Sequence, residues 1–123
     1  MHTQSDEFVD SAGRRIRFEI EGDIVAYHGA NEVGRIEFED VEIDDWQSFT
    51  RLIGVDVIAA YQEAGIGVEL VRRAVIEHGH FDRPPLHASG GLDRDARDFY
   101  TPEGAALIRR CIALGILAED SDE

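Results

Sequence analysis

The sequence contains no lysine, and its charge is strongly one-sided. All 12 of its strongly basic residues are arginine, against 26 aspartates and glutamates, which gives a formal net charge of −14. Such a surface repels the phosphates of nucleic acids and of anionic membranes, so we expect neither as a partner. It would attract a cationic substrate or partner, although solubility alone explains the same charge. Both ends of the chain are acidic, and 1–12 and 118–123 are expected to be flexible tails.

Cysteine is nearly absent, and long apolar runs are missing. The single cysteine cannot form a disulfide within the chain, and Cys111 lies among apolar residues at helical spacing. We expect it to be a small buried side chain rather than a nucleophile. No apolar run approaches the roughly 18 residues of a membrane-spanning helix, and the polar start does not resemble a signal peptide. These features predict a cytoplasmic protein.

The first half of the chain predicts a sheet. A length of 123 residues indicates one domain with one hydrophobic core. Polar and apolar residues alternate over 15–20, 24–28 and 33–43, and turns containing glycine separate these segments. An apolar run over 52–58 predicts a fourth strand. Four strands in meander order favour an antiparallel sheet.

The second half predicts mainly helices. Apolar residues three and four apart indicate a helix over 64–78, which ends at a glycine. A short strand over 86–89 and a short helix over 93–99 follow. A Thr-Pro pair then begins a last helix over 102–114, with Thr101 as its N-cap. The order of strands, helix, strand and helix predicts an α+β fold with a mostly antiparallel sheet and one crossover.

The segment 62–67, with the sequence Gln-Glu-Ala-Gly-Ile-Gly, lies where the fourth strand gives way to the first helix. The first N–H groups of a helix have no internal partner, and the helix dipole adds positive charge there, so this turn predicts an anion site. Gly65 and Gly67 would let a phosphate approach the backbone. No Lys-Ser/Thr pair follows, which excludes a P-loop, and the first glycine of a dinucleotide fingerprint is missing. A helix start that needs glycine only for packing is the alternative.

Two stretches resemble motifs of the GNAT superfamily of N-acetyltransferases. Residues 57–67 are similar to its acetyl-CoA motif: a strand valine, then Tyr-Gln, then Gly-x-Gly. Residues 93–100, with Gly104 four residues on, are similar to its second motif, Asn-x-x-Ala-x-x-Phe-Tyr-x-x-x-Gly, except that Asp93 replaces the asparagine. The two motifs occur in the family's order. The resemblance implies a single GNAT-like domain over 1–123, with a crossover helix after the glycine turn, that uses acetyl-CoA as cosubstrate.

The resemblance also implies roles for individual residues. In the family the strand before the turn splays from the next strand, its backbone pairs with the pantetheine arm, and the turn holds the pyrophosphate. The implied cofactor-binding residues are Val57, Ile58, Gln62, Glu63, Ala64, Gly65, Ile66, Gly67 and Asp93. Tyr100 matches the tyrosine that protonates the leaving thiolate in many members, and a packed tyrosine is the alternative.

No residue is marked as the general base. The candidates are Glu37, Glu39 and Asp56, on strands near the expected cleft, with ordinary surface carboxylates as the alternative. No metal site is expected, because His78 and His80 have no third ligand nearby in the sequence.

The sequence departs from the family in three places. Glu63 and Ala64 stand where the family often has glycine and a basic residue, the two early helices are missing, and a helix follows Gly104 instead of two strands. Two functions stay open: direct transfer of acetyl to a cationic small-molecule or peptide amine, and a GNAT-fold module without transferase activity that senses CoA or binds a basic partner. An unrelated α+β domain is a third interpretation. An uncovered apolar sheet face would favour a homodimer.

Overall fold

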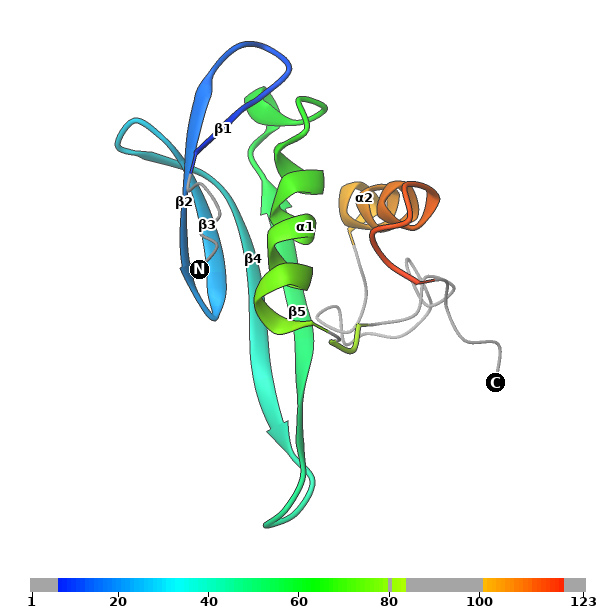
Figure 1. The fold of residues 1–123 in the computed structure, drawn as a ribbon. Helices are drawn as coiled ribbons and strands as arrows, with labels where there is room; N and C mark the ends of the chain where they lie inside the picture. The colour runs from blue at the N-terminus through cyan, green and yellow to red at the C-terminus, as the bar shows by residue number, and fades with distance from the viewer. Residues whose placement is uncertain (1–6, 80, 84–100, 119–123) are drawn as a thin grey trace.

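The computed structural model describes residues 7–79, 81–83 and 101–118. A five-stranded antiparallel sheet has the order β1-β2-β3-β4-β5, and two α-helices follow it in the chain (Figure 1). The elements are β1 (Glu7–Val9), β2 (Arg15–Glu21), β3 (Asp23–His28), β4 (Asn31–Glu42), β5 (Ser48–Val57), a 3-10 turn η1 (Ala59–Tyr61), α1 (Ile66–His78) and α2 (Pro102–Ala113). The α+β class and the four predicted strands, now β2 to β5, are confirmed. The strand and short helix expected over 86–89 and 93–99 lie outside the described residues.

The core lies between α1 and one face of the sheet. Alternation along β2 buries Ile16 and Phe18, and α1 contributes Leu70 and Ala74 to the same core. Fully burying such a side chain stabilises the fold by roughly 1.5–3 kcal/mol for a leucine or isoleucine. The helix ends are also as predicted, since Gly79 closes α1 with φ 71° and the Thr101 hydroxyl accepts from the Gly104 N–H at 3.0 Å. Neither helix of the described residues is long and apolar enough to cross a bilayer.

Helix α2 lies beside α1, on the side away from β1 to β3 (Figure 1). It contacts both α1 and β5. Cys111 is fully buried on it, as predicted, and burial raises the pKa of its thiol to about 11. A thiol in this state is a poor nucleophile near neutral pH.

The opposite face of the sheet carries ion pairs. Arg17 contacts Glu19 at 2.6 Å, and Arg35 contacts Glu37 at 3.5 Å. Alternation directs these side chains away from the core. An apolar sheet face would have favoured the expected homodimer; these charged side chains give it no support, and the homodimer stays a prediction.

The expected tail over 1–12 is wrong for residues 7–12. Glu7–Val9 pairs with β2, and the Phe8 ring packs 6.2 Å from that of Phe18. The Asp10 side chain, which is fully buried, then organises the next turn by accepting from the N–H groups of Ala12 and Arg14 at 3.0 and 2.9 Å. The hydrogen bonds to Asp10 satisfy its buried carboxylate and fix the turn between β1 and β2, so the short strand β1 stays paired with β2. At the other end, Ala118 is described, whereas 119–123 are not.

The strand that would complete the predicted crossover, over 86–89, lies outside the described residues, but the chain returns to β5 just before it. After α1 the chain runs parallel to β5 for a short distance, with Asp82 bridging to Arg51. The Leu52 N–H donates to the Asp82 carbonyl at 2.7 Å, and the Asp82 N–H donates to the Thr50 carbonyl at 2.9 Å. In the described part of the chain, this contact covers the outer edge of β5 only at residues 50–52.

Candidate functional site

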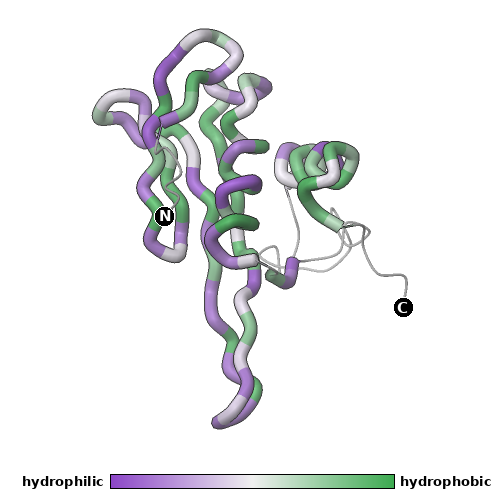
Figure 2. The backbone as a smooth tube through the Cα atoms, viewed as in Figure 1, coloured by the Kyte–Doolittle hydropathy of each residue, from purple (hydrophilic) through white to green (hydrophobic). Residues whose placement is uncertain are grey.

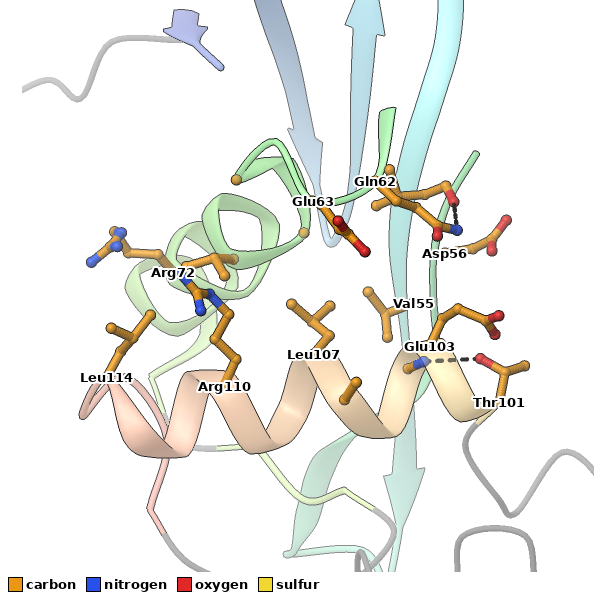
Figure 3. Close-up of a pocket in the computed structure, with 16 residues that line it drawn as sticks. Val55, Asp56, Gln62, Glu63, Arg72, Thr101, Glu103, Leu107, Arg110 and Leu114 are labelled. Carbon is orange, nitrogen blue, oxygen red and sulfur yellow. Dashed lines mark hydrogen bonds between the residues drawn. The ribbon is translucent and has the colours of Figure 1, made fainter. Parts of the chain in front are cut away.

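A cavity of about 670 Å³ opens between the end of β5, the turn after it and α2 (Figure 3). Its volume lies within the roughly 300–1,000 Å³ typical of small-molecule sites. The lining residues are Val55, Asp56, Val57, Gln62, Glu63, Gly65, Gly67, Val68, Arg72, Thr101, Glu103, Gly104, Ala106, Leu107, Arg110 and Leu114.

The turn before α1 has the backbone of an anion site. Gly65 is the N-cap with φ 94°, and no side chain caps the helix. Within the described ranges, the N–H groups of residues 66–68 have no acceptor. Unpaired donors at the positive end of a helix dipole favour a bound phosphate.

Glu63 has φ 63°, a left-handed conformation that is uncommon for residues other than glycine. Strain of this kind often marks functional sites. The Glu63 carboxylate lies in the cavity (Figure 3), where it opposes a bound anion.

The second glycine of the turn has a packing role as well. A Cβ atom at Gly67 would lie 3.1 Å from the two Cδ atoms of Leu107 on α2. Gly67 therefore lets the two helices approach closely, and the packing interpretation of this glycine has direct support. Gly65 differs, because its positive φ requires glycine or a tolerant residue such as asparagine.

The outer edge of β5 faces the cavity at Val55 and Val57. The Ile58 N–H donates to the Val33 carbonyl on β4 at 2.9 Å. Alternation in an antiparallel ladder then turns the backbone groups of Val57 and Val55 toward the outer edge. At that edge the Val57 carbonyl accepts from Gln62 Nε2 at 2.8 Å. An extended ligand can pair with this edge, and it would replace the Gln62 amide as the donor to the Val57 carbonyl.

The cavity is charged at both ends. Arg72 and Arg110 lie at one end, while Asp56 and Glu103 lie toward the other (Figure 3). In the described part of the chain Arg110 has no partner, and Arg72 contacts only Glu69, at 3.4 Å. Two available guanidinium groups are notable in a chain of net charge −14, and they suit a phosphate.

Arg72 and Arg110 were not among the predicted site residues, although the sequence carries a signal for them. Gly65, Val68 and Arg72 recur at three- and four-residue spacing on α1, as Leu107 and Arg110 do on α2. Each set shares a helix face.

The structure brings part of the predicted cofactor set together. Val57, Gln62, Glu63, Gly65 and Gly67 all line the cavity.

Three other predicted residues do not line it. The Ile58 N–H is used by β4, while Ala64 and Ile66 are 5% and 0% exposed and pack inward. The Ala64 carbonyl accepts from the Ser11 N–H at 2.9 Å, which fixes the turn rather than contacting a ligand.

Of the base candidates, only Asp56 is among the lining residues, and its carboxylate points away from the cavity (Figure 3). Glu37 and Glu39 are paired with Arg35 and Arg51, at 3.5 and 2.9 Å. Their strand positions alternate with core positions such as Ile36, so they face the other side of the sheet. Asp93 and Tyr100 lie outside the described residues.

The loop after β1 supports the turn from behind. Arg14 lies over the Tyr61 ring, 3.9 Å from its centroid, and Nη1 donates to the Ala60 carbonyl at 3.3 Å. Asp10 holds Arg14 through Nε at 2.8 Å. Burial opposes ionisation of Asp10, but the hydrogen bonds from Arg14 and Ala12 outweigh it and lower the pKa of the carboxyl.

We expect Asp10→Ala to destabilise the fold by about 1–3 kcal/mol, because buried donors lose their acceptor. A lowered pKa stabilises the fold above its usual value near 4, and that contribution is lost as the pH falls through the lowered pKa. The difference between wild type and variant should therefore narrow below about pH 4 in urea unfolding followed by circular dichroism. Asp10→Asn keeps one acceptor oxygen, so its free energy of unfolding should lie between those of wild type and Asp10→Ala. Equal stability of all three proteins at neutral pH would contradict this role.

No group of three or more His, Cys, Asp or Glu side chains in the described residues is placed to hold a metal ion. A comparison with known protein families found no matching family, and comparisons with curated proteins and with solved structures found no match. The function is therefore inferred from the site itself.

Proposed function

We propose that this chain is a small cytoplasmic N-acetyltransferase with a GNAT-like fold, which transfers acetyl from acetyl-CoA to a cationic amine. One observation carries the proposal. The outer edge of β5 around Val55 and the N–H groups at the start of α1, which have no acceptor among the described residues, border the same cavity. Such a site suits a ligand that carries both an extended chain with amide groups and a pyrophosphate, and CoA carries both.

The residues fit the parts of the cosubstrate. The N–H groups of residues 66–68 would hold the pyrophosphate, and Arg72 and Arg110 would neutralise the phosphate charge. The outward backbone of Val55 and Val57 would pair with the pantetheine amides. In this orientation the nucleotide of CoA would lie at the arginine end of the cavity, and the pantetheine would lie along the β5 edge.

Direct transfer requires few groups. The amine nitrogen attacks the thioester carbonyl, a C–N bond forms, and the C–S bond breaks as the thiolate leaves. A base takes the ammonium proton and an acid returns one to sulfur. Glu103 lies toward the end of the cavity opposite the arginines and suits the base. Asp56 lies at the same end, but it stands opposite Arg35 in the β4–β5 ladder, so its carboxylate is directed to the other face of the sheet. Tyr100 stays the proposed proton donor.

The test is titration with acetyl-CoA by calorimetry. Wild type should bind at micromolar concentrations. Arg110→Ala should weaken binding about five- to tenfold, because a charge-assisted bond to phosphate contributes about 1–1.5 kcal/mol. Arg109→Ala is the matched control: Arg109 is the exposed neighbour on α2, does not line the cavity, and should bind as wild type does. No heat at high micromolar acetyl-CoA would overturn the proposal.

A CoA-binding module without transfer is the second candidate. Glu63 in the cavity and Gln62 on the Val57 carbonyl favour it, because both compete with a tightly held cosubstrate. Thiol release from acetyl-CoA, measured with a panel of primary amines, separates the two. A transferase releases thiol only when an amine is present, and Tyr100→Phe should lower that rate while affinity for acetyl-CoA is unchanged. Binding without release supports the module.

A further inference from the structure

Strands β4 and β5 continue beyond the rest of the sheet as a two-stranded hairpin (Figure 1). The pairing of β3 with β4 ends at Ile36, whereas β4 and β5 stay paired from Glu39 opposite Arg51 to Glu42 opposite Ser48. We call residues 39–51 the acidic arm. Figure 2 shows hydrophilic and hydrophobic residues mixed along it down to its tip. An isolated two-stranded hairpin contributes little to a fold, so the arm calls for another explanation.

The tip of the arm presents a tryptophan in a defined turn. Asp44 Oδ1 accepts from the N–H groups of Trp46 and Gln47, at 2.8 and 2.9 Å, and the Ile43 N–H donates to the Gln47 carbonyl at 2.9 Å. Trp46 is 89% exposed and Ile43 is 59% exposed. A large aromatic ring held in solvent by an ordered turn is available for contact with a partner.

Negative charge surrounds this ring. The acidic arm carries five carboxylates and a single arginine, Arg51, which pairs with Glu39 at 2.9 Å. Among the described residues, Glu42 and Asp45 have no partner. Both line a hollow of about 260 Å³ together with Trp46. Trp46 therefore stands beside two carboxylates that have no partner among the described residues.

We propose that the acidic arm docks an arginine- or lysine-rich segment of another protein, with one cationic side chain against Trp46. A cation over the face of an indole is attracted by the ring quadrupole, and the carboxylates of Glu42 and Asp45 complement the remaining charges. A second copy of this chain is disfavoured, because two arms would bring ten carboxylates together. Phosphate-bearing surfaces are disfavoured for the same reason. The arm does not line the 670 Å³ cavity, so this inference is independent of acetyl transfer.

Trp46 is the only tryptophan of the chain, so its fluorescence reports on the arm directly. The probe is a synthetic arginine–glycine repeat peptide, with a glutamate–glycine peptide as the control ligand. The basic peptide should change the Trp46 emission saturably and the acidic peptide should not. Loss of two charge contacts of about 0.5 kcal/mol each should weaken the peptide about fivefold in Glu42→Gln/Asp45→Asn. This variant leaves the Asp44 turn intact.

The matched control is Glu21→Gln/Glu77→Gln, which removes the same charge at two exposed sites away from the tip. It should change peptide affinity less than about twofold. If both double variants lowered the affinity for the basic peptide equally, overall charge would explain the effect, and the proposed docking site would be overturned. An emission change on raising protein concentration alone would identify a second copy as the occupant, and no saturable change would exclude the arm. Calorimetry with Trp46→Ala should show the same loss without relying on fluorescence.

Discussion

Replacing Gly65 with aspartate is expected to abolish measurable acetyl-CoA binding at micromolar concentrations, while asparagine at the same position largely preserves it. Asparagine and aspartate adopt positive φ more readily than other side chains, so both carry a similar strain at the φ of 94°, and both would place Cβ against the same neighbour, Phe8 Cζ at 3.5 Å. They differ only in charge. A carboxylate about 4 Å from a phosphate costs up to about 4 kcal/mol at an effective dielectric constant near 20. We expect at least a tenfold difference between the two variants.

Calorimetry on the pair measures this directly, and circular dichroism shows whether both fold. An aspartate near the start of a helix interacts favourably with the helix dipole, so Gly65→Asp is not expected to unfold α1. Loss of acetyl-CoA binding with retained helicity would therefore indicate that the carboxylate repels the ligand. If Gly65→Asp binds acetyl-CoA as tightly as Gly65→Asn, the anion does not lie at this turn. If both variants lose binding equally, shape rather than charge is responsible.

The largest effect on stability is expected from Arg73→Met. Arg73 is 4% exposed, and its Nε donates to Glu69 Oε2 at 2.8 Å, while its guanidinium lies 4.3 Å from the centroid of the Phe18 ring. Removing Arg73 leaves the Glu69 carboxylate buried with only the longer contact to Arg72, at 3.4 Å, and breaking such a buried pair costs up to about 3–5 kcal/mol. Urea unfolding followed by circular dichroism measures the loss, because Trp46 on the acidic arm does not report on the core.

Two further variants sharpen this prediction. Arg72 also contacts Glu69, but its side chain is 49% exposed, so Arg72→Met should cost less than about 1 kcal/mol. The double variant Glu69→Leu/Arg73→Met removes both buried charges and should recover most of the lost stability. A double variant as unstable as Arg73→Met alone would show that packing, and not the unpaired charge, governs this position.

Regular alternation and helix caps made most elements predictable. The alternating segment after Val33 became β4, and the Thr101-Pro102 pair began α2 at the expected residue. These signals are local, since each depends on residues only a few positions apart. The crossover expected after α1 stays a prediction, because only the bridge between Asp82 and Arg51 lies in the described residues.

Features that depend on long-range partners were not predictable. Glu7–Val9 looked like part of an acidic tail because its stability comes from β2 and from the buried turn at Asp10. Ile58 seemed equivalent to Val57 as a backbone contact, yet strand alternation gives them opposite edges. Arg110 reaches the cavity only because α2 packs beside α1.

The hydrogen bond between the Gln62 amide and the Val57 carbonyl also bears on solubility. An uncovered strand edge is a template for pairing with other chains and so promotes aggregation. On β5 the bridge to Asp82 covers one part of the edge and the Gln62 amide blocks another, and among the described residues nothing pairs with the stretch around Val55. Gln62→Ala should thus raise the tendency of the free protein to aggregate, and a ligand seated along β5 would protect against it. Gln62 therefore caps the β5 edge until a ligand displaces it.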